Sequence, residues 1–234
     1  MYEIKRIFNE ALKQGRKNLT LYESLYVIKK YGLNVADFVL IKDVREIDYV
    51  LDKIKFPLVV KVSSSNIVHK SDVGGVILDI NSTKELKDSV LKVDKKIKER
   101  FPDAYVDGFV LQSMIRDGYE VIIGGLHDEQ FGPIIAFGLG GIFVEVLKDV
   151  AFDIAPVSFR DALELINQIK GYKILLGYRG KPKANIEDLA KTISTVSRFL
   201  WDFRGYIEEM DLNPVIVTSE CSTIVDSRII LKNK

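Results

Sequence analysis

Short apolar segments rich in β-branched residues recur along this chain, and in its second half many of them are separated by only a few residues. The expected strands cover residues 56–62, 76–80, 108–113, 119–126, 133–137 and 143–147, and a hairpin of residues 206–218 and 222–231 closes the chain. Strands joined by short turns run antiparallel, because a parallel neighbour needs a crossover of about a dozen residues or more. The pattern therefore predicts mixed or antiparallel sheets.

Helices with recognisable starts lie between these strands. Thr20 and Glu23 form a capping box, and Gly32 can take the left-handed conformation that ends a helix. Further starts are expected at Asp43, Ser82, Ser158 and Asn185, and residues 2–14 have the spacing of an amphipathic helix. This irregular alternation predicts an α+β fold, or α/β with mixed sheets, in two lobes.

The long charged helix that starts at Ser82 is expected to end near Arg100, and strands dominate after it. We therefore expect an N-terminal helix in residues 1–19, a first lobe in residues 20–105 and a second lobe in residues 106–234.

The composition excludes several classes of protein. Hydrophobic residues make up 47% of the 234 residues, enough for a packed core. The 34 Lys and Arg residues against 33 Asp and Glu residues give a net charge of +1, so no overall charge attracts nucleic acid or an anionic membrane. The single cysteine, Cys221, excludes an intrachain disulfide and fits a reducing, cytoplasmic setting. The longest apolar stretch, residues 132–147, is too short for a membrane span, and the charged N-terminus is unlike a signal peptide.

Lys61 stands inside an apolar strand, in the run PLVVKV. An unpaired buried ammonium is costly, so this side chain either reaches a phosphate or another charged group, or lies on an edge strand facing solvent. The residue alone leaves both interpretations open.

A loop dense in small and polar residues follows and ends in the glycine pair Gly74–Gly75. It contains His69, one of two histidines in the chain, within the sequence HKSD. Imidazole can serve as a base, a metal ligand or a phosphoryl acceptor, although a lone loop histidine commonly only caps a turn. The adjacent cation, carboxylate and glycines favour a chemical role. The other histidine, His127, lies in an expected hairpin turn and is interpreted as structural.

The glycine-rich turn FGLGGI occupies residues 137–142. Such a turn lets backbone N–H groups approach a phosphate, but a tight strand connection has the same sequence character. It is neither a Walker A loop nor a GxGxxG motif that opens a helix.

Oxygen-bearing side chains near the C-terminus suit a hard cation. Asp211 and Asn213 alternate on an expected strand and so share a face, and Asp226 lies on the next expected strand. Mg²⁺ takes few such protein ligands and completes its shell with substrate phosphates. The alternative is a solvated acidic face, which is favoured for Glu208 and Glu209.

These segments in this order resemble the ATP-grasp superfamily and, within it, the β subunits of ADP-forming (nucleoside-diphosphate-forming) acyl-CoA synthetases. The resemblance rests on PLVVKVSSSNIVHKSDVGGV, FVLQSMIRDGYEVIIGGLHDEQFGPIIAFGLGGIFVEVLKDVAF, MDLNPVIV and IVDSRI, which with their spacing cover residues 20–231. The HKSD-GG segment is specific to this group. The D-x-N-P strand is shared with succinyl-CoA synthetases, where the pattern is E-x-N-P and glutamate stands in place of Asp211.

The resemblance implies an ATP-grasp fold whose two lobes hold a nucleotide between them. It implies the reversible reaction of acetyl-CoA, ADP and phosphate to acetate, CoA and ATP. A separate CoA-binding α subunit would make an acyl phosphate and pass on its phosphoryl group, the two subunits forming an α2β2 heterotetramer in which residues 1–19 contact the partner.

The resemblance also implies a role for each candidate residue. His69 would be the β-side phosphohistidine, Lys61 would bind the nucleotide phosphates, and Asp211, Asn213 and Asp226 would hold Mg²⁺. The backbone of residues 112–115, which include Gln112 and Met114, would bind the adenine edge. Glu120 would contact ribose or metal, and Gly140 and Gly141 would admit phosphates or an incoming loop.

Two other classes stay open. One is an ATP-grasp ligase that forms an acyl phosphate without a phosphohistidine, against which the HKSD-GG segment argues. The other is a non-catalytic nucleotide-binding subunit, against which the retained Lys61, His69 and Asp226 argue.

Overall fold

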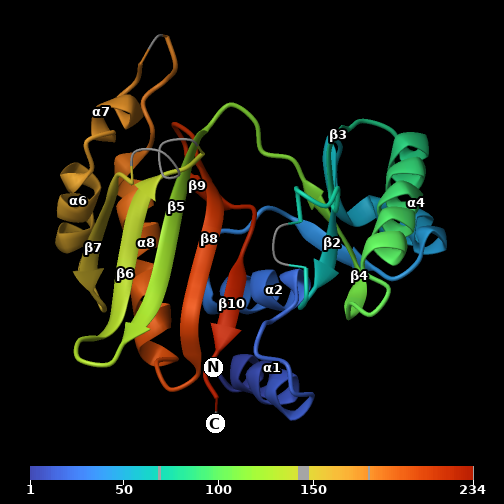
Figure 1. Cartoon of the computed structure of the whole chain (residues 1–234). Helices are drawn as coiled ribbons and strands as arrows, with labels where there is room; N and C mark the ends of the chain where they lie inside the picture. Colours follow the sequence, from blue (N-terminus) through green and yellow to red (C-terminus); the bar gives the residue numbers. More distant parts are fainter. Residues whose placement is uncertain (68–69, 142–147, 179, 234) are drawn as a thin grey trace.

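Two antiparallel sheets, each covered by helices on one face, form the protein (Figure 1). This computed structural model describes residues 1–67, 70–141, 148–178 and 180–233. The expected strand of residues 143–147 lies outside the described residues. Among those that are described, no helix combines the length and the apolar character that crossing a membrane requires.

The smaller sheet has four strands in the order β1-β4-β2-β3. These are β1 (Phe38–Ile41), β2 (Leu58–Ser64), β3 (Val76–Ile80) and β4 (Val106–Ser113). Helices α3 (Ile47–Val50) and α4 (Thr83–Arg100), with the 3₁₀ turns η1 (Val44–Glu46) and η2 (Leu51–Lys53), belong to the same unit. Apolar residues of α4, such as Leu86 and Val93, are fully buried in the core that α4 forms with this sheet.

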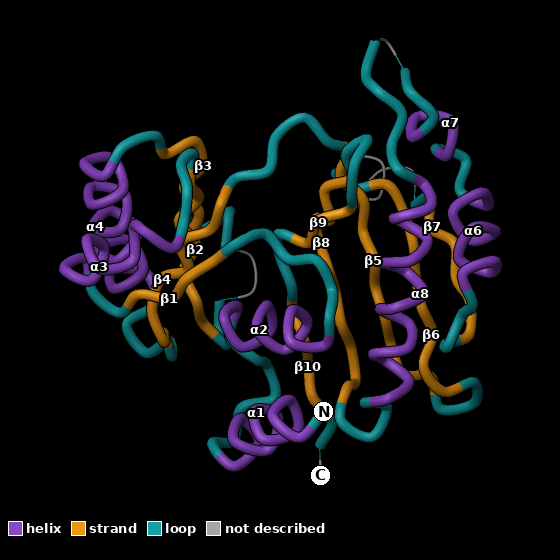
Figure 2. Tube along the Cα trace, turned by 180° about the vertical axis from the view of Figure 1, so that it is seen from behind, coloured by secondary structure: helices purple, strands orange, loops and turns teal. Residues whose placement is uncertain are grey.

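The larger sheet has six strands, with β10-β8-β5-β6-β7 in order and β9 paired to β8. They are β5 (Tyr119–Asp128), β6 (Gly132–Leu139), β7 (Val150–Ile154), β8 (Ile207–Val217), β9 (Ser222–Ile224) and β10 (Arg228–Leu231). Helices α6 (Phe159–Gln168) and α8 (Ile186–Asp202) cover one face of this sheet, and α7 (Tyr172–Leu175) follows α6 (Figures 1 and 2).

The first two helices pack with this larger sheet although they start the chain. Helix α1 (Tyr2–Lys13) buries Ile4 and Phe8 completely, and the ring of Phe8 lies 5.4 Å from that of Phe203 just beyond α8. Helix α2 (Leu21–Tyr31) adds Leu25 to the same core. Apolar side chains within residues 1–19, which were expected to contact a partner, therefore pack inside the chain itself.

The capping signals in the sequence correspond to real helix starts. The Thr20–Glu23 and Ser158–Asp161 pairs form capping boxes, and Asn185 accepts a hydrogen bond from the Asp188 N–H at 3.0 Å. Asp43 accepts one from the Arg45 N–H, but it opens a 3₁₀ turn followed by a single α-turn and no long helix.

The passage between the two sheets lies later than the division expected after residue 105. Strand β4 pairs along its length with β2 and β1, so the smaller sheet continues to Ser113 and the larger one begins at Tyr119. Strands β1 and β7 were not expected, because both are short. The partner of β1, strand β4, is distant in sequence, and the partner of β7, strand β6, already forms a hairpin with β5.

Candidate functional site

A cleft of about 360 Å³ lies between the two sheets, a volume within the range of small-molecule sites. It is lined by Val59, Lys61, Ser71, Val76, Leu78, Gln112, Ser113, Met114, Ile115, Glu120, Asn213, Pro214, Ile216, Val225 and Asp226. Six of the ten residues singled out from the sequence are in this set: Lys61, Gln112, Met114, Glu120, Asn213 and Asp226. The cleft therefore joins segments that are far apart in the chain.

Lys61 lies on β2, which has a neighbour on both sides, so the interpretation as an exposed edge lysine is wrong. Its side chain is only 7% exposed. The ammonium donates to the carbonyl of Val225 and lies 3.4 Å from an Asp226 carboxylate oxygen. Burial lowers the pKa of Lys61, and Lys70 lowers it further, whereas the Asp226 carboxylate opposes the shift.

Asp226 accepts from a second lysine. Lys70 Nζ lies 3.1 Å from the other carboxylate oxygen, and all three side chains are largely buried. Asp226 lies in a short break between β9 and β10, whereas the sequence placed it on a strand. The break turns Asp226 toward β2, across the cleft from its own sheet.

Asp211 and Asn213 lie on β8, as expected, but differ in position. Asn213 is exposed in the cleft, whereas Asp211 is absent from the cleft lining and faces Arg228 on β10. Burial raises the pKa of Asp211, while Arg228 opposes the rise and Asp226 adds to it. An extra residue on β8 opposite Ile122 forms a bulge at this point, a device that redirects side chains beside functional sites.

The hinge segment that connects the two sheets has part of its backbone engaged. The N–H groups of Ser113 and Met114 donate to the carbonyls of Asp37 and Pro57. Gln112 is 1% exposed, and its side-chain Nε2 has no hydrogen-bond partner among the described residues. A buried amide donor of this kind at the wall of a cleft indicates a ligand acceptor.

The glycine pair Gly140–Gly141 lies beside the cleft and is absent from its lining. The Gly140 N–H donates to the Glu120 carbonyl at 2.7 Å, and a Cβ at Gly140 would come within 3.0 Å of the Glu120 Cβ. Gly141 has a left-handed φ of 62°, and a Cβ added there would meet open space.

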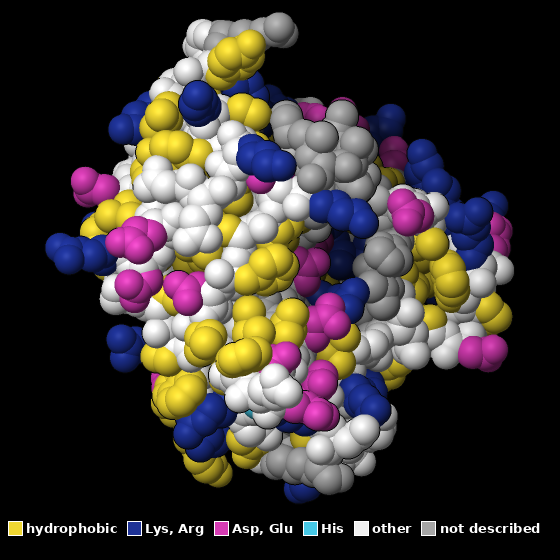
Figure 3. All heavy atoms as spheres, turned by 60° about the vertical axis from the view of Figure 1, so that its left-hand side comes forward, with side chains coloured by type: hydrophobic (Ala, Val, Ile, Leu, Met, Phe, Trp, Pro, Cys, Tyr) yellow, Lys and Arg dark blue, Asp and Glu magenta, His cyan; other side chains and the backbone are white. Residues whose placement is uncertain are grey.

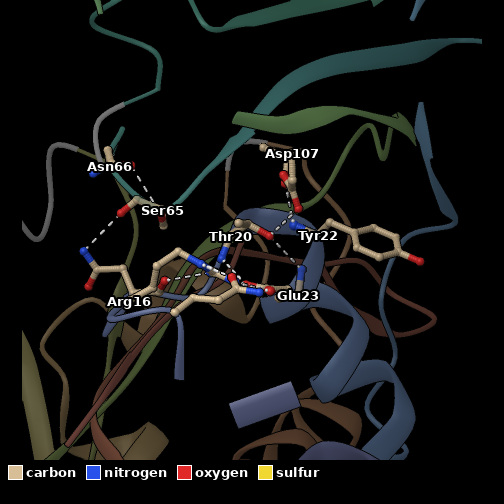
Figure 4. Close-up of polar contacts among 10 residues, drawn as sticks. Arg16, Thr20, Tyr22, Glu23, Ser65, Asn66 and Asp107 are labelled. Carbon is tan, nitrogen blue, oxygen red and sulfur yellow. Dashed lines mark hydrogen bonds and ion pairs between the residues drawn. The ribbon is translucent and has the colours of Figure 1, made fainter. Parts of the chain in front are cut away.

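His69 lies outside the described residues, but the segment around it is anchored on both sides. Before it, the Ser65 carbonyl accepts from the Asn18 side chain, and Asn66 Oδ1 accepts from the Tyr105 N–H. Ser65 and Asn66 are labelled in Figure 4. After it, the Lys70 carbonyl accepts from the Gly75 N–H, and Ser71 lines the cleft. Neither Lys70 nor Ser71 was assigned a role from the sequence, although the HKSD motif contains both.

The oxygen-bearing side chains of the cleft suit a divalent cation only if a bound ligand supplies further oxygens. Among the described residues, no group of three or more His, Cys, Asp or Glu side chains could hold a metal ion. Asp226 and Asn213 nevertheless present hard oxygens in one cleft, and Mg²⁺ commonly needs only one or two carboxylates beside substrate phosphates.

Comparison with known proteins identifies the family to which this chain belongs. The ATP-grasp domain model matches residues 10–231, and the chain belongs to that family. The β subunit of the ADP-forming acetate–CoA ligase II of Pyrococcus furiosus is 44% identical over 98% of both chains. The ADP-forming acetate–CoA ligase I of Archaeoglobus fulgidus is 41% identical over 97% of this chain, which spans only 33% of that longer protein.

Solved structures show the same fold. The acetyl-coenzyme A synthetase 1 of Ca. Korarchaeum cryptofilum, in complex with coenzyme A, Ca-AMPCP and HgCl⁺, superposes with a TM-score of 0.93 at 38% identity, covering 97% of this chain and 99% of that one. Another structure of that enzyme contains a phosphorylated phosphohistidine segment, with a TM-score of 0.88 at 36% identity, covering 98% of this chain and all of that one.

Proposed function

We propose that this chain is the nucleotide-binding β subunit of an ADP-forming acetyl-CoA synthetase. With a CoA-binding α subunit, it interconverts acetyl-CoA, ADP and phosphate with acetate, CoA and ATP. One observation carries the assignment: the buried Lys61 meets Asp226 across a cleft between two antiparallel sheets. Full-length identity of 44% to a β subunit of this enzyme class supports it.

Lys61 and Asp226 prepare the cleft for phosphates. The Lys61 ammonium is held in place and partly desolvated, so it can bind a phosphate oxygen with little reorganisation. Asp226 and Asn213, with Asp211 behind them on β8, would hold Mg²⁺ against those phosphates. When bound, the cation neutralises charge on the phosphates during transfer.

The hinge segment recognises the base. Because Ser113 and Met114 use their N–H groups within the protein, the Gln112 side-chain amide, whose Nε2 has no partner among the described residues, is the group of this segment best placed to meet the adenine edge. Met114 and Val59 provide apolar surface at the same wall of the cleft. Glu120, exposed in the cleft, contacts ribose or metal.

His69 carries the phosphoryl group. In the ATP-forming direction, the α subunit delivers a phosphoryl group to the imidazole nitrogen, and ADP then accepts it. The P–N bond breaks as a P–O bond to the terminal ADP phosphate forms. Gly140 packs closely against Glu120, and Gly141 after it faces open space that would admit the phosphates or the incoming segment of the partner. The two subunits assemble as an α2β2 heterotetramer.

Labelling with [γ-³²P]ATP and Mg²⁺ tests the assignment on the isolated chain. We expect a label that is stable in base and labile in acid, and that is lost in His69→Ala while ADP affinity stays within about threefold. A label on a carboxylate would instead be labile in base and would support an acyl phosphate ligase. Nucleotide binding without any labelling would support a regulatory subunit and overturn the proposal.

A further inference from the structure

One face of the six-stranded sheet has no helix on it within the described part of the chain. Helices α1, α2, α6 and α8 all lie on the opposite face, as the two opposed views show (Figures 1 and 2). A sheet face without a covering layer is expected to carry polar side chains. This one does not.

Apolar side chains form two rows across three strands of the open face. Strand register places Leu126 opposite Ile134, and Ile134 opposite Ile154. The next row consists of Gly124, Ala136 and Phe152. Residues directly opposite in a sheet share a face, so each row is continuous.

These side chains are open to solvent in the isolated chain. Phe152 is 57% exposed, Ile154 51% and Leu126 40%, and Phe131 in the turn between β5 and β6 is 58% exposed. Figure 3 shows hydrophobic side chains gathered on this side of the molecule, with acidic side chains at their border. Single exposed apolar residues are ordinary, but a contiguous group bordered by charge marks an interaction site.

The border is formed by β8 and β10. Glu209 is opposite Leu126, and Asp211 is opposite Gly124, so both apolar rows meet acidic residues on β8. Arg228 on β10 forms an ion pair with Glu209 at 2.7 Å. The surface therefore has an apolar centre and a charged rim, the anatomy of a stable protein interface.

The same sheet face leads to the nucleotide cleft. Glu120, Gly124 and Leu126 alternate along β5 on one side of the sheet, with Glu120 in the cleft and Leu126 among the apolar rows. A protein bound to the rows would lie next to the cleft. That position suits a partner that must deliver a phosphoryl group there.

One relative carries further chain joined to the counterpart of this one. In the Archaeoglobus fulgidus protein, the counterpart of this chain is 33% of a single polypeptide, so the rest is joined to it covalently. Permanent partners bury interfaces that are larger and more apolar than those of transient complexes.

We propose that this apolar surface, formed by Leu126, Phe131, Ile134, Phe152 and Ile154, is the docking site of the CoA-binding subunit. The assignment rests on the proposed function, because that function supplies the partner. The surface would hold the partner beside the cleft, while the cleft itself binds the nucleotide.

The test compares two double variants with a control in the purified two-subunit enzyme. Phe152→Asp/Ile154→Asp places charge in the rows, and Phe152→Thr/Ile154→Thr removes the apolar surface but keeps side chains suited to a strand. The control is Tyr49→Asp, which changes a side chain that is 82% exposed in the other lobe. Subunit affinity is measured by sedimentation velocity over a concentration series.

We expect the aspartate variant to weaken subunit binding at least 100-fold and the threonine variant at least 10-fold, with the control unchanged. ADP affinity of the isolated variants should stay within twofold of wild type, which shows that they are folded. Wild-type affinity in the threonine variant would overturn the proposal. So would self-association of the isolated chain through this face, or a wild-type chain that binds no CoA-binding subunit. Labelling of the isolated chain by ATP needs no partner and reports on the proposed function separately.

Discussion

The charges of the cleft converge on one residue, Asp226. Lys61 reaches it from the centre of the smaller sheet, and Lys70, the residue directly after His69, reaches its other carboxylate oxygen. One carboxylate between two ammonium groups leaves a positive charge that suits a phosphate. Lys70 is also fixed at the cleft by both its side chain and its carbonyl.

Lys70→Ala should slow phosphoryl transfer without removing the nucleotide. The anchor after His69 would lose its ion pair, and a small misplacement of a reacting group lowers a rate by about 100-fold. We expect ATP-dependent phosphorylation of the chain to fall by that order, with ADP affinity within threefold and partial rescue in Lys70→Arg. Rapid-quench labelling and calorimetric titration would check this. Equal rates in Lys70→Ala and wild type would show that Lys70 has no positioning role.

Asp107 is a buried carboxyl group outside the cleft, on β4. Its Oδ2 accepts from the Thr20 hydroxyl at 2.7 Å (Figure 4), while its Oδ1 has no partner among the described residues. Burial raises the pKa of Asp107, and the hydroxyls of Ser63 and Thr20 only partly oppose the shift. The folded protein therefore holds a proton here at a pH where the unfolded chain has released it.

That difference predicts a pH-dependent loss of stability. The contribution of a protonated Asp107 is complete below the unfolded pKa of about 3.9 and is lost as pH rises to the higher folded pKa. Asp107→Asn cannot titrate, so its free energy of unfolding should improve relative to wild type as pH rises above the unfolded pKa of about 3.9. Urea unfolding of both proteins across this range measures the difference. Parallel curves would show that Asp107 ionises normally in the folded state.

At the scale of elements, strand β4 joins the smaller sheet through a close backbone approach. Gly108 has a φ of 146°, and a Cβ there would come within 2.3 Å of the Ile41 carbonyl oxygen on β1. Only glycine allows β1 and β4 to approach this closely while β4 also pairs with β2.

Gly108→Ala should therefore destabilise the smaller lobe. The backbone contact cannot be relieved by a side-chain rotation, so we expect a loss of about 3 kcal/mol in the free energy of unfolding. Gly205→Ala is the matched control, because a Cβ at Gly205 meets nothing within 4 Å. Denaturant unfolding monitored by circular dichroism compares them. Similar midpoints for the two variants would contradict this account of the β1–β4 contact.

Local signals explain why some elements could be predicted from sequence and others could not. Capping by Thr20 and Ser158 depends on residues within one turn, and β2 and β5 are long apolar runs, so all four were predicted. Whether β4 belongs to the first or the second sheet depends on partners far away in sequence, and the expected division after residue 105 placed it with the second.

The candidate site divides in the same way. Residue types pointed to Lys61, Asn213 and Asp226, and the family resemblance pointed to Gln112 and Glu120, and all five line one cleft. The Lys61–Asp226–Lys70 contact was not predicted, because it needs the two sheets to face each other. The different surroundings of Asp211 and Asn213, two residues apart, depend on a bulge that has no clear signal in the sequence.

At the scale of the whole molecule, the start of the chain completes the core of its end. Phe8 is fully buried, and its ring lies 5.4 Å from Phe203 and 5.7 Å from Tyr206. The larger lobe therefore cannot be assembled from the second half of the chain alone.

Phe8→Ala should weaken the protein as a whole, by about 3–5 kcal/mol of unfolding free energy, because it opens a cavity in this shared core. Tyr2→Ala on the same helix changes a side chain that is 85% exposed and should stay within about 0.5 kcal/mol of wild type. Thermal unfolding followed by near-ultraviolet circular dichroism compares the variants. A small effect of Phe8→Ala would show that α1 is a dispensable attachment.

Strand β10 also forms hydrogen bonds with the segment between α1 and α2. Leu19 N–H donates to the Ile229 carbonyl, Leu231 N–H donates to the Lys17 carbonyl, and the two termini lie near each other (Figure 1). During synthesis, α1 and α2 leave the ribosome long before their packing partners are made. The nascent chain must keep Phe8 uncovered until Phe203 and Tyr206, which pack against it, have been made. Completion of the larger lobe consequently waits for the synthesis of β10, and the emerging helices are the segments a ribosome-associated chaperone has reason to shield.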